Sequence, residues 1–311
     1  MPDFWFPMKK RALDLYDGHS SRFAWALARF LRVLGNAWVR WIADPLLPET
    51  STVQLWRDRF LHLNQAVGDL FPSLTHVVSF ETVQENCLVF RPFTDDADRV
   101  SKNYEDIVRR LLSPQTSEVI VDVGANIGIH TVWFARKVGP SGLVLAIEPE
   151  PNNYAILEAN RRVNNLGNVV PIRISLSSTS GVGGLSVPKP TSMGQVRTVA
   201  STGSSNSALV SVRLQTLDDL VSSRGVRVSA IKIDVEGSEL SVLQGARDTI
   251  RTFGPRLLIE VHGRQNLSPI RASLHSLNMM ILSETQASKR PDEERRFVLA
   301  LPSQHHPIDS G

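Results

Sequence analysis

The sequence predicts an α/β fold with a mostly parallel sheet, preceded by a helical N-terminal extension. Between residues 85 and 303, short aliphatic runs alternate with segments of helical periodicity, which is the pattern of parallel strands joined by crossover helices. In "EVIVDVGANIGIHT" (118–131) a strand, a glycine-containing turn and a helix follow one another, the order in which such folds build a ligand-binding turn. Residues 1–80 carry five of the six tryptophans and are predicted to be mostly helical. Residues 304–311 are expected to form a tail.

Aliphatic runs predict five buried strands, and a further pair of strands is expected to close the sheet. The strands are expected at 118–123, 143–148, 169–174, 230–235 and 257–261, with the closing pair at 279–283 and 297–301. Helices are expected at 127–138, 152–164, 238–252 and 269–277. The Ser/Thr/Gly-rich segment 188–209 is predicted to be a long loop of the kind that covers a binding site. The charged run 289–296 is predicted to be the turn of the final hairpin.

The composition excludes some classes of protein and leaves others open. With 311 residues, of which 42% are hydrophobic, the chain is large enough for a substantial core. The net charge is only +3, and no stripe of Lys and Arg interleaved with aromatic residues is present, so no nucleic-acid partner is expected. The single cysteine, Cys87, excludes an internal disulfide framework and a cysteine-based zinc site. The N-terminus lacks the pattern of a secretory signal, and a cytoplasmic location is expected.

The segment 22–42, "RFAWALARFLRVLGNAWVRWI", is predicted to be an amphipathic helix. At 100° per residue its arginines lie on one side and its large apolar residues lie on the opposite side. The segment is long enough to cross a bilayer, but Arg29 and Arg32 near its centre would each cost roughly 2.5–3.5 kcal/mol on insertion scales. We therefore expect this helix to dock on the protein itself or to contact a membrane surface.

The turn at 124–128 is suited to a ligand that approaches the backbone. Gly124 and Gly128 lack a Cβ, and the helix after them offers free N–H groups and the positive end of its dipole. Glu148 ends the next predicted strand, where a carboxylate can accept hydrogen bonds from both ribose hydroxyls of an adenosine. Dinucleotide binding requires G-x-G-x-x-G, whereas the run here is Gly-Ala-Asn-Ile-Gly after Asp122. A carboxylate at Asp122 would repel a pyrophosphate but suits an ammonium or a sulfonium, which predicts S-adenosylmethionine as the cofactor.

A second set of ionisable residues interrupts two strands that are otherwise apolar. In "AIKIDVEGSELSVLQGA" (230–246), Lys232 and Asp234 share one face of a strand, and Glu236 follows the strand end. The next strand ends in "LLIEVHG", which places Glu260 and His262 on one side. Because ligands of open α/β sheets bind outside the carboxyl ends of the strands, these groups predict a functional site. A purely structural ion pair of Lys232 with a neighbouring carboxylate remains the alternative.

Together these motifs resemble the FkbM family of S-adenosylmethionine-dependent methyltransferases. The resemblance extends from about Val89 to Pro302 and rests on "NYEDIVRRLL", "VDVGANIGIHT", "AIEPEPNNYAILEANRRVNN", "QTLDDL", "LLIEVHG" and, most specifically, "KIDVEGSE". It implies a class I (Rossmann-like) methyltransferase fold, a seven-stranded sheet with an antiparallel last strand. It also implies that Glu148 binds the ribose, that the turn from Asp122 to Gly128 holds the methionine part, and that Glu105 helps to close the pocket. The implied cofactor-binding residues are Glu105, Asp122, Gly124, Asn126, Gly128, Thr131, Glu148, Pro149 and Ser175.

One departure from the family concerns the adenine. After the third strand, "PIRISLSSTSG" has no carboxylate or Asn where related chains often contact the adenine, so Ser175, Ser177 or the backbone would have to serve.

The resemblance implies methylation of a hydroxyl on a small molecule or glycan. His262 is the first candidate for the general base, because its ordinary pKa lies near neutrality. Asp234, Glu236 and Glu239 are expected to orient Lys232 and the acceptor, or else to bind a divalent cation. Metal-free catalysis is the favoured alternative, and no metal ligand is assigned. A nicotinamide-dependent oxidoreductase and a non-catalytic module bound to the membrane surface remain as rival interpretations.

Overall fold

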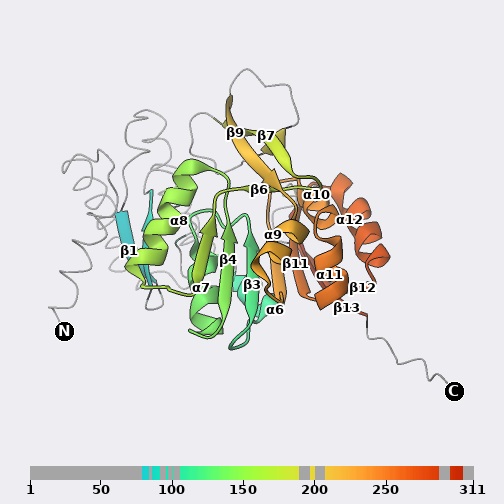
Figure 1. Cartoon of the computed structure of the whole chain (residues 1–311), viewed down its shortest axis with the longest axis horizontal. Helices are drawn as coiled ribbons and strands as arrows, with labels where there is room; N and C mark the ends of the chain where they lie inside the picture. The colour runs from blue at the N-terminus through green and yellow to red at the C-terminus, as the bar shows by residue number, and fades with distance from the viewer. Residues whose placement is uncertain are drawn as a thin grey trace, which may run out of the picture. The chain divides into compact units, whose positions relative to one another are not determined.

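A computed structural model of the chain describes most of the residues from 79 to 303 (Figure 1). The described residues are 79–83, 86–91, 96, 100, 106–188, 197–199, 207–286 and 295–303. The predicted helical extension 1–80, apart from its last two residues, lies outside them, as do the amphipathic segment 22–42, Glu105 and the tail 304–311. The chain divides into two compact units, and the larger one comprises residues 105–157, 165–187 and 195–311.

The larger unit is built on a seven-stranded sheet with the strand order β12-β13-β11-β10-β3-β4-β5. Its strands are β3 (Val119–Val123), β4 (Leu143–Ile147), β5 (Val169–Ile172), β10 (Ala230–Ile233), β11 (Arg256–His262), β12 (Met279–Gln286) and β13 (Arg295–Pro302). The pairs from β5 through β11 are parallel, whereas β13 runs antiparallel to both β11 and β12. The predicted fold class, a mostly parallel seven-stranded sheet with an antiparallel last strand, is therefore confirmed.

The helices of this unit connect the strands and cover the sheet (Figure 1). They are α6 (Asp106–Leu112), α7 (Ile129–Val138), α8 (Pro151–Val163, whose residues 158–163 belong to the smaller unit), α9 (Leu217–Arg224), α10 (Glu239–Gln244), α11 (Arg247–Phe253) and α12 (Arg264–Ser276). The core between helices and sheet is formed by aliphatic side chains of β3, β4, β10 and β11, among them Val121, Leu145, Ile231 and Ile259, all with no exposed surface. These continuous aliphatic runs are typical of parallel strands that are covered on both faces.

Two helices differ from the sequence-based expectation. The single helix expected at 238–252 is divided into α10 and α11 at Gly245, where an added Cβ would lie 2.1 Å from the carbonyl oxygen of Ser177. The start of α11 is stabilised by Asp218, whose carboxylate accepts hydrogen bonds from the backbone N–H groups of Asp248 (3.1 Å) and Thr249 (2.7 Å). The helix expected at 269–277 begins earlier, at Arg264, and contains Pro269 in its interior.

A second, smaller sheet was not predicted. It has four strands in the order β6-β9-β7-β8, with the bounds Ser175–Leu176, Ser207–Gln215, Gly181–Pro188 and Arg197–Val199. The segment 188–209 is therefore not one continuous loop, because β8 and the start of β9 lie within it. The sheet has its own small core, in which Leu185 and Val212 are buried against Val210 and Leu214.

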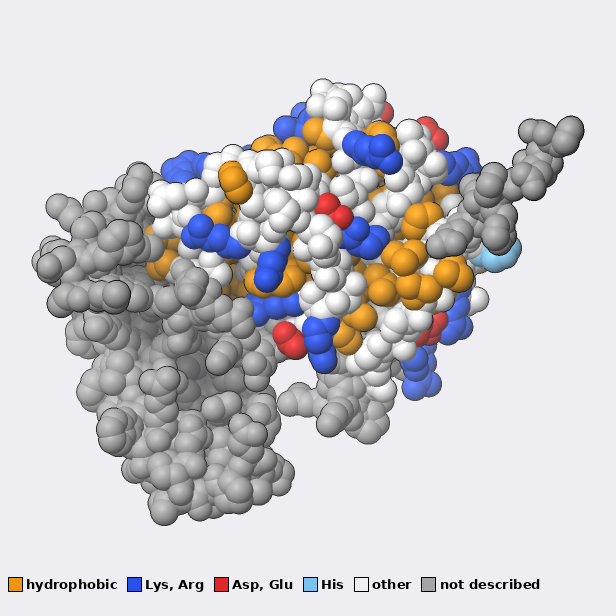
Figure 2. Space-filling view, turned by 90° about the horizontal axis from the view of Figure 1, so that it is seen from below, with side chains coloured by type: hydrophobic (Ala, Val, Ile, Leu, Met, Phe, Trp, Pro, Cys, Tyr) orange, Lys and Arg blue, Asp and Glu red, His pale blue; other side chains and the backbone are white. Residues whose placement is uncertain are grey.

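The final hairpin is longer than predicted. Arg295 already belongs to β13 and pairs with His262 of β11, so the run 289–296 is not entirely a turn. On the edge strand β12, Met279 packs on the core while Met280 and Leu282 are 49% and 50% exposed, as the period of a strand with one buried face requires. On the face drawn in Figure 2, Lys and Arg side chains lie in several separate places between hydrophobic and uncharged side chains. Within the described residues, no helix is long and apolar enough to span a bilayer.

The smaller unit contains a hairpin of β1 (Ser79–Val83) and β2 (Asn86–Phe90) and residues 158–163 of α8. Two asparagines of α8 bind the β2 backbone as a neighbouring strand would. The amide of Asn160 accepts from the N–H of Val89 (2.6 Å) and donates to its carbonyl (3.0 Å), and Asn164 does the same for Cys87 (2.9 and 2.7 Å). The N–H and carbonyl groups of Cys87 and Val89 therefore have hydrogen-bond partners although they are buried. This explains why two asparagines lie on a buried face of α8.

Candidate active site

The turn between β3 and α7 depends on its two glycines. Gly124 has a φ of +76°, and an added Cβ would lie 1.8 Å from the carbonyl oxygen of Asp234 on the neighbouring strand end. Gly128 has a φ of +90°, and a Cβ there would lie 2.6 Å from Cδ1 of Leu157. Both positions combine a left-handed backbone with close packing, which a residue other than glycine cannot satisfy without strain. The sequence therefore identified two positions where the backbone, rather than a side chain, determines the turn.

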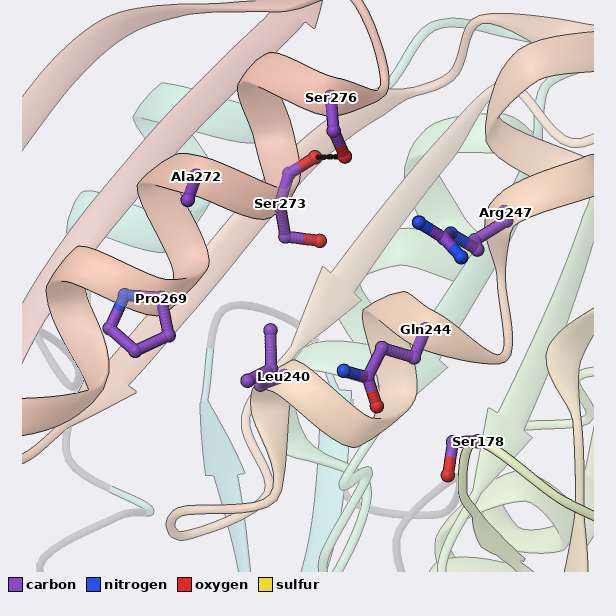
Figure 3. Close-up of a pocket in the computed structure, with 8 residues that line it drawn as sticks. All are labelled: Ser178, Leu240, Gln244, Arg247, Pro269, Ala272, Ser273 and Ser276. Atoms are coloured by element: carbon purple, nitrogen blue, oxygen red, sulfur yellow. Dashed lines mark hydrogen bonds between the residues drawn. The ribbon is translucent and has the colours of Figure 1, made fainter.

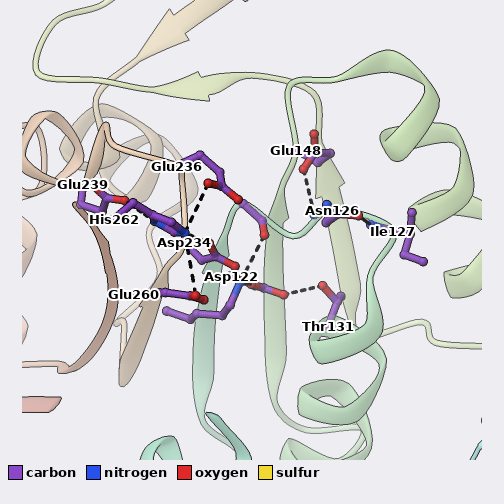
Figure 4. A network of polar contacts seen from close by, with 12 residues as sticks. Asp122, Asn126, Ile127, Thr131, Glu148, Asp234, Glu236, Glu239, Glu260 and His262 are labelled. Atoms are coloured by element: carbon purple, nitrogen blue, oxygen red, sulfur yellow. Dashed lines mark hydrogen bonds and ion pairs between the residues drawn. The ribbon is translucent and has the colours of Figure 1, made fainter. Parts of the chain in front are cut away.

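Glu148 lies at the end of β4 and faces this turn (Figure 4). Its carboxylate accepts hydrogen bonds from the backbone N–H groups of Asn126 (2.8 Å) and Glu150 (2.9 Å). Burial raises the pKa of Glu148 to about 7, even though these hydrogen bonds favour its ionised form. Glu148 is therefore a carboxyl group that changes its charge near neutral pH at the rim of the predicted cofactor turn.

Asp122 and Lys232 form a buried ion pair beneath the turn. The two residues face each other in the parallel register of β3 and β10, and their side chains are 3.2 Å apart. The second carboxylate oxygen of Asp122 accepts a hydrogen bond from the hydroxyl of Thr131 at 2.6 Å. Lys232 also donates to the carbonyl oxygen of Gly124 at 3.2 Å and lies 3.5 Å from Asp234. Lys232 therefore connects the turn between β3 and α7 to the residues at the end of β10.

We define the acidic cluster as Asp234, Glu236, Glu239 and Glu260 together with His262, at the ends of β10 and β11 (Figure 4). Nδ1 of His262 lies 2.8 Å from Oε1 of Glu239, which is fully buried and also accepts a hydrogen bond from the N–H of Gly237. Nε2 of His262 lies 3.4 Å from Glu236 and 3.8 Å from both Asp234 and Glu260. Glu236 has a φ of +53° and Gly237 one of +102°, so a left-handed turn directs the Glu236 carboxylate back toward His262.

The carboxylates of the acidic cluster determine the charge of His262. Burial lowers the pKa of His262, but the hydrogen bond to Glu239 and the neighbouring carboxylates outweigh burial and raise it to about 9. In this state the imidazole carries a proton on both nitrogens at neutral pH. A role of His262 as general base would require one of these protons to leave first, and this role stays a prediction.

The structure brings most of the predicted site residues together along the ends of β3, β4, β10 and β11. Those with contacts to one another or to the turn are Asp122, Gly124, Asn126, Thr131, Glu148, Lys232, Asp234, Glu236, Glu239 and His262. Pro149 is half-buried beside Glu148. Ser175 is buried in β6 and pairs with Leu214 of the second sheet, and Ser177 contacts Ser241 of α10 at 3.2 Å. The part of either serine in adenine binding stays a prediction.

Two residues of the site were missed in the sequence. Arg295 of β13 donates a hydrogen bond to Glu260 at 2.8 Å and was assigned to a solvated turn. Glu150 begins α8 by accepting a hydrogen bond from the N–H of Asn153 at 2.6 Å, and its charge helps to raise the pKa of Glu148. The capping pattern of an acidic residue three positions before Asn153 is visible in the sequence, whereas the pairing of Arg295 with Glu260 depends on the strand order.

A separate open depression of about 520 Å³ lies among α10, α11 and α12 (Figure 3). It is lined by Ser178, Leu240, Gln244, Arg247, Pro269, Ala272, Ser273 and Ser276. None of these was predicted as a site residue. The charged and buried groups that can carry chemistry lie instead in the acidic cluster, so we place the candidate active site there.

The chain is similar to known methyltransferases. Hexuronic acid methyltransferase AglP of Haloferax volcanii is 32% identical over 160 residues, which are 51% of this chain and 62% of AglP. The chain therefore matches less than two thirds of the length of that relative. Methyltransferase sdnD of Sordaria araneosa is 27% identical over 202 residues, covering 56% of this chain and 78% of sdnD. Among solved structures, methyltransferase FkbM of Methylobacillus flagellatus KT is 22% identical, with a TM-score of 0.43 over 58% of this chain and 43% of that one.

The family itself follows from a match to its domain. The Methyltransferase FkbM domain matches residues 122–284, from the buried aspartate of β3 to the edge strand β12. This range includes the glycine turn, Glu148 and the whole acidic cluster. Because it spans just over half of the 311 residues, the chain belongs to the FkbM methyltransferase family.

Proposed function

We propose that this protein transfers the methyl group of S-adenosylmethionine to a hydroxyl oxygen of a sugar or another small molecule. The observation that carries the proposal is the contact of Lys232 with both Asp122 under the glycine turn and Asp234 of the acidic cluster. This contact makes the cofactor turn and the acidic cluster direct neighbours, as transfer between two bound molecules requires. The relative AglP is named a hexuronic acid methyltransferase, which supports a sugar as the acceptor class.

The residues around the turn fit an adenosyl cofactor. Glu148 offers a buried carboxylate at a strand end, where it can accept hydrogen bonds from ribose hydroxyls. Gly124 and Gly128 hold the backbone of the turn in left-handed conformations, packed against Asp234 and Leu157. When bound, S-adenosylmethionine supplies an electrophilic methyl carbon, and the C–S bond breaks with its electron pair going to sulfur as the C–O bond forms.

The acidic cluster is placed to receive the acceptor and its proton. The hydroxyl proton has to leave as the C–O bond forms, and the carboxylates of Asp234 and Glu236 lie at the open side of the cluster, where both are half-buried. Lys232 keeps Asp234 in position from below. We assign proton acceptance to this carboxylate pair and keep His262, with Glu239 behind it, as the group that orients the pair.

The test is transfer of a labelled methyl group. The full chain is incubated with methyl-tritiated S-adenosylmethionine and a panel of hexuronic acid glycosides, neutral glycosides and phenols, and products are identified by mass and by methanolysis. We expect a methyl ether on a hydroxyl, lost in Glu148→Ala and retained in the control Glu284→Gln, which removes a half-buried carboxylate that is paired with Arg271 outside the site. A product methylated on nitrogen or carbon, or binding of a nicotinamide dinucleotide in place of S-adenosylmethionine, would reject the proposal.

Contact of the segment 22–42 with a membrane surface stays a separate prediction. Co-sedimentation of the full chain with anionic liposomes tests it. We expect the variant with Arg29, Arg32 and Arg40 substituted to lose liposome binding. Equal sedimentation of the wild type and this variant would contradict the prediction.

A further inference from the structure

We infer that Asp234, Glu236 and His262 form a binding site for a divalent cation. Each of the three side chains offers one ligand atom, and these atoms all lie within 4.8 Å of one another. They come from the ends of two adjacent strands, β10 and β11, and converge on one point (Figure 4). Two carboxylate oxygens and one imidazole nitrogen are a donor set that binds Mn²⁺ and Mg²⁺, and also other divalent metals.

The position of His262 points to a ligand independently of the carboxylates. Its Nδ1 is held by Glu239, which has no exposed surface, and this leaves Nε2 directed at the other two residues. Nε2 is itself buried and makes no hydrogen bond, although Glu236 lies 3.4 Å away. In many metal-binding histidines, a carboxylate accepts a hydrogen bond from the ring nitrogen that does not bind the metal. This hydrogen bond fixes the orientation of the ring and its tautomer.

The charges of the cluster also favour a cation. Four carboxyl groups surround His262. The protonated imidazole, Lys232 beside Asp234 and Arg295 beside Glu260 offset only part of their charge. Carboxylates that share a half-buried site repel one another. A bound divalent ion removes this repulsion, whereas an anionic ligand would increase it.

The three protein ligands leave coordination positions for water and for an oxygen of the acceptor. A hydroxyl group bound to the cation there would have a lowered pKa. It would also lie close to the glycine turn, because one side chain, Lys232, contacts both Asp234 and Asp122. This second role rests on the proposed function, while cation binding itself does not. With a cation bound, Asp234 and Glu236 act as ligands rather than as proton acceptors, and His262 binds through Nε2 after the proton on that nitrogen has left. This reverses the sequence-based preference for metal-free catalysis.

The test uses Mn²⁺ and the full chain without cofactor or acceptor. Binding is followed by the loss of the free-Mn²⁺ signal in electron paramagnetic resonance, and pulsed measurements detect the nitrogen of a coordinated imidazole. We expect one site, at least tenfold weaker in Asp234→Asn and Glu236→Gln, and no nitrogen coupling in His262→Gln. Glu239→Gln is expected to lower the affinity by 10- to 100-fold, as for other residues that hold a metal-binding histidine. The control Glu284→Gln should bind Mn²⁺ like the wild type.

Circular dichroism and thermal melting show that each variant is folded before its affinity is compared. Absence of Mn²⁺ binding up to 1 mM, or unchanged affinity and nitrogen coupling in His262→Gln, would overturn the inference. Calorimetry with S-adenosylmethionine in the presence of a chelator tests the proposed function independently of the cation site. Cofactor binding without Mn²⁺ binding rejects only the cation site, and Mn²⁺ binding without cofactor binding rejects only the proposed function.

Discussion

Glu148 is expected to make cofactor affinity fall as the pH decreases below about 7. Burial raises the pKa of Glu148 from 4.5 to about 7, and the hydrogen bonds from the N–H groups of Glu150 and Asn126 counteract burial only in part. Ribose hydroxyls donate to an ionised carboxylate, so cofactor binding selects the deprotonated form. With a pKa of about 7, roughly 3% of Glu148 is ionised at pH 5.5, and we expect Kd to be about 30-fold higher there than at pH 8.5.

The same shift acts in the opposite direction on the stability of the cofactor-free protein. Between pH 4.5 and 7 the folded state holds a proton on Glu148 that the unfolded state has lost. The protonated form of Glu148 therefore stabilises the folded state, relative to the ionised form. This stabilisation is fully present below pH 4.5 and is lost as the pH rises through 7. A shift of this size corresponds to about 3 kcal/mol.

Calorimetric titration with S-adenosylhomocysteine, the demethylated product of the cofactor, measures the effect on affinity from pH 5.5 to 8.5. Its sulfur is an uncharged thioether, so no sulfonium charge contributes to the pH dependence. Glu148→Gln removes the titrating group and should bind more weakly with an affinity that varies little with pH. Glu284→Gln should retain the wild-type profile. A flat profile in the wild type, or the same pH dependence in Glu148→Gln, would refute the assignment of Glu148 to the ribose.

Three further predictions concern the turn and its support, and urea denaturation measures each of them. Gly124→Ala should lower the free energy of unfolding by about 4 kcal/mol, since it combines a positive φ with a Cβ only 1.8 Å from the Asp234 carbonyl oxygen; an unchanged midpoint would contradict the close packing. Lys232→Met should cost about 3–5 kcal/mol because it leaves Asp122 buried without its cation, and the double variant with Asp122→Asn should recover part of this loss if the ion pair is the cause. Thr131→Val removes the 2.6 Å hydrogen bond to Asp122 and should cost about 1–2 kcal/mol; Thr131→Ser should retain most of the stability, and equal losses in both variants would assign the effect to packing.

The main sheet could be predicted because its strands are buried on both faces. Aliphatic runs such as "VIVDV" and "AIKI" predict buried strands, and glycines indicate the turns that follow them. Helix boundaries were predicted less well where a distant residue decides them. The break between α10 and α11 depends on Asp218, some thirty residues earlier in the chain, whose carboxylate caps α11. The local sequence from Ser238 to Thr252 has continuous helical periodicity and gives no sign of this contact.

The second sheet was missed because its sequence resembles a loop. Glycine and serine are frequent from Gly181 to Ser207, and such residues are depleted in strands. The strands are stabilised instead by pairing with β9 and by a small core around Leu185. This depends on tertiary contacts, which composition alone does not predict.

The structure gives Asp122 a different electrostatic role from the one that the sequence predicted. From the sequence, its carboxylate was expected to favour a sulfonium and to repel a pyrophosphate. In the structure Asp122 has no exposed surface, and Lys232 and Thr131 bind its two oxygens, so most of its charge is offset within the protein. Discrimination between the two classes of cofactor therefore depends less on Asp122 than on the groups that face the turn. Of these, Glu148 keeps an ionisable carboxyl at the rim, and Asn126 occupies, with a left-handed backbone, the position where a dinucleotide turn has its second glycine. Asp122 is then best understood as the residue that fixes Lys232 between the cofactor turn and the acidic cluster.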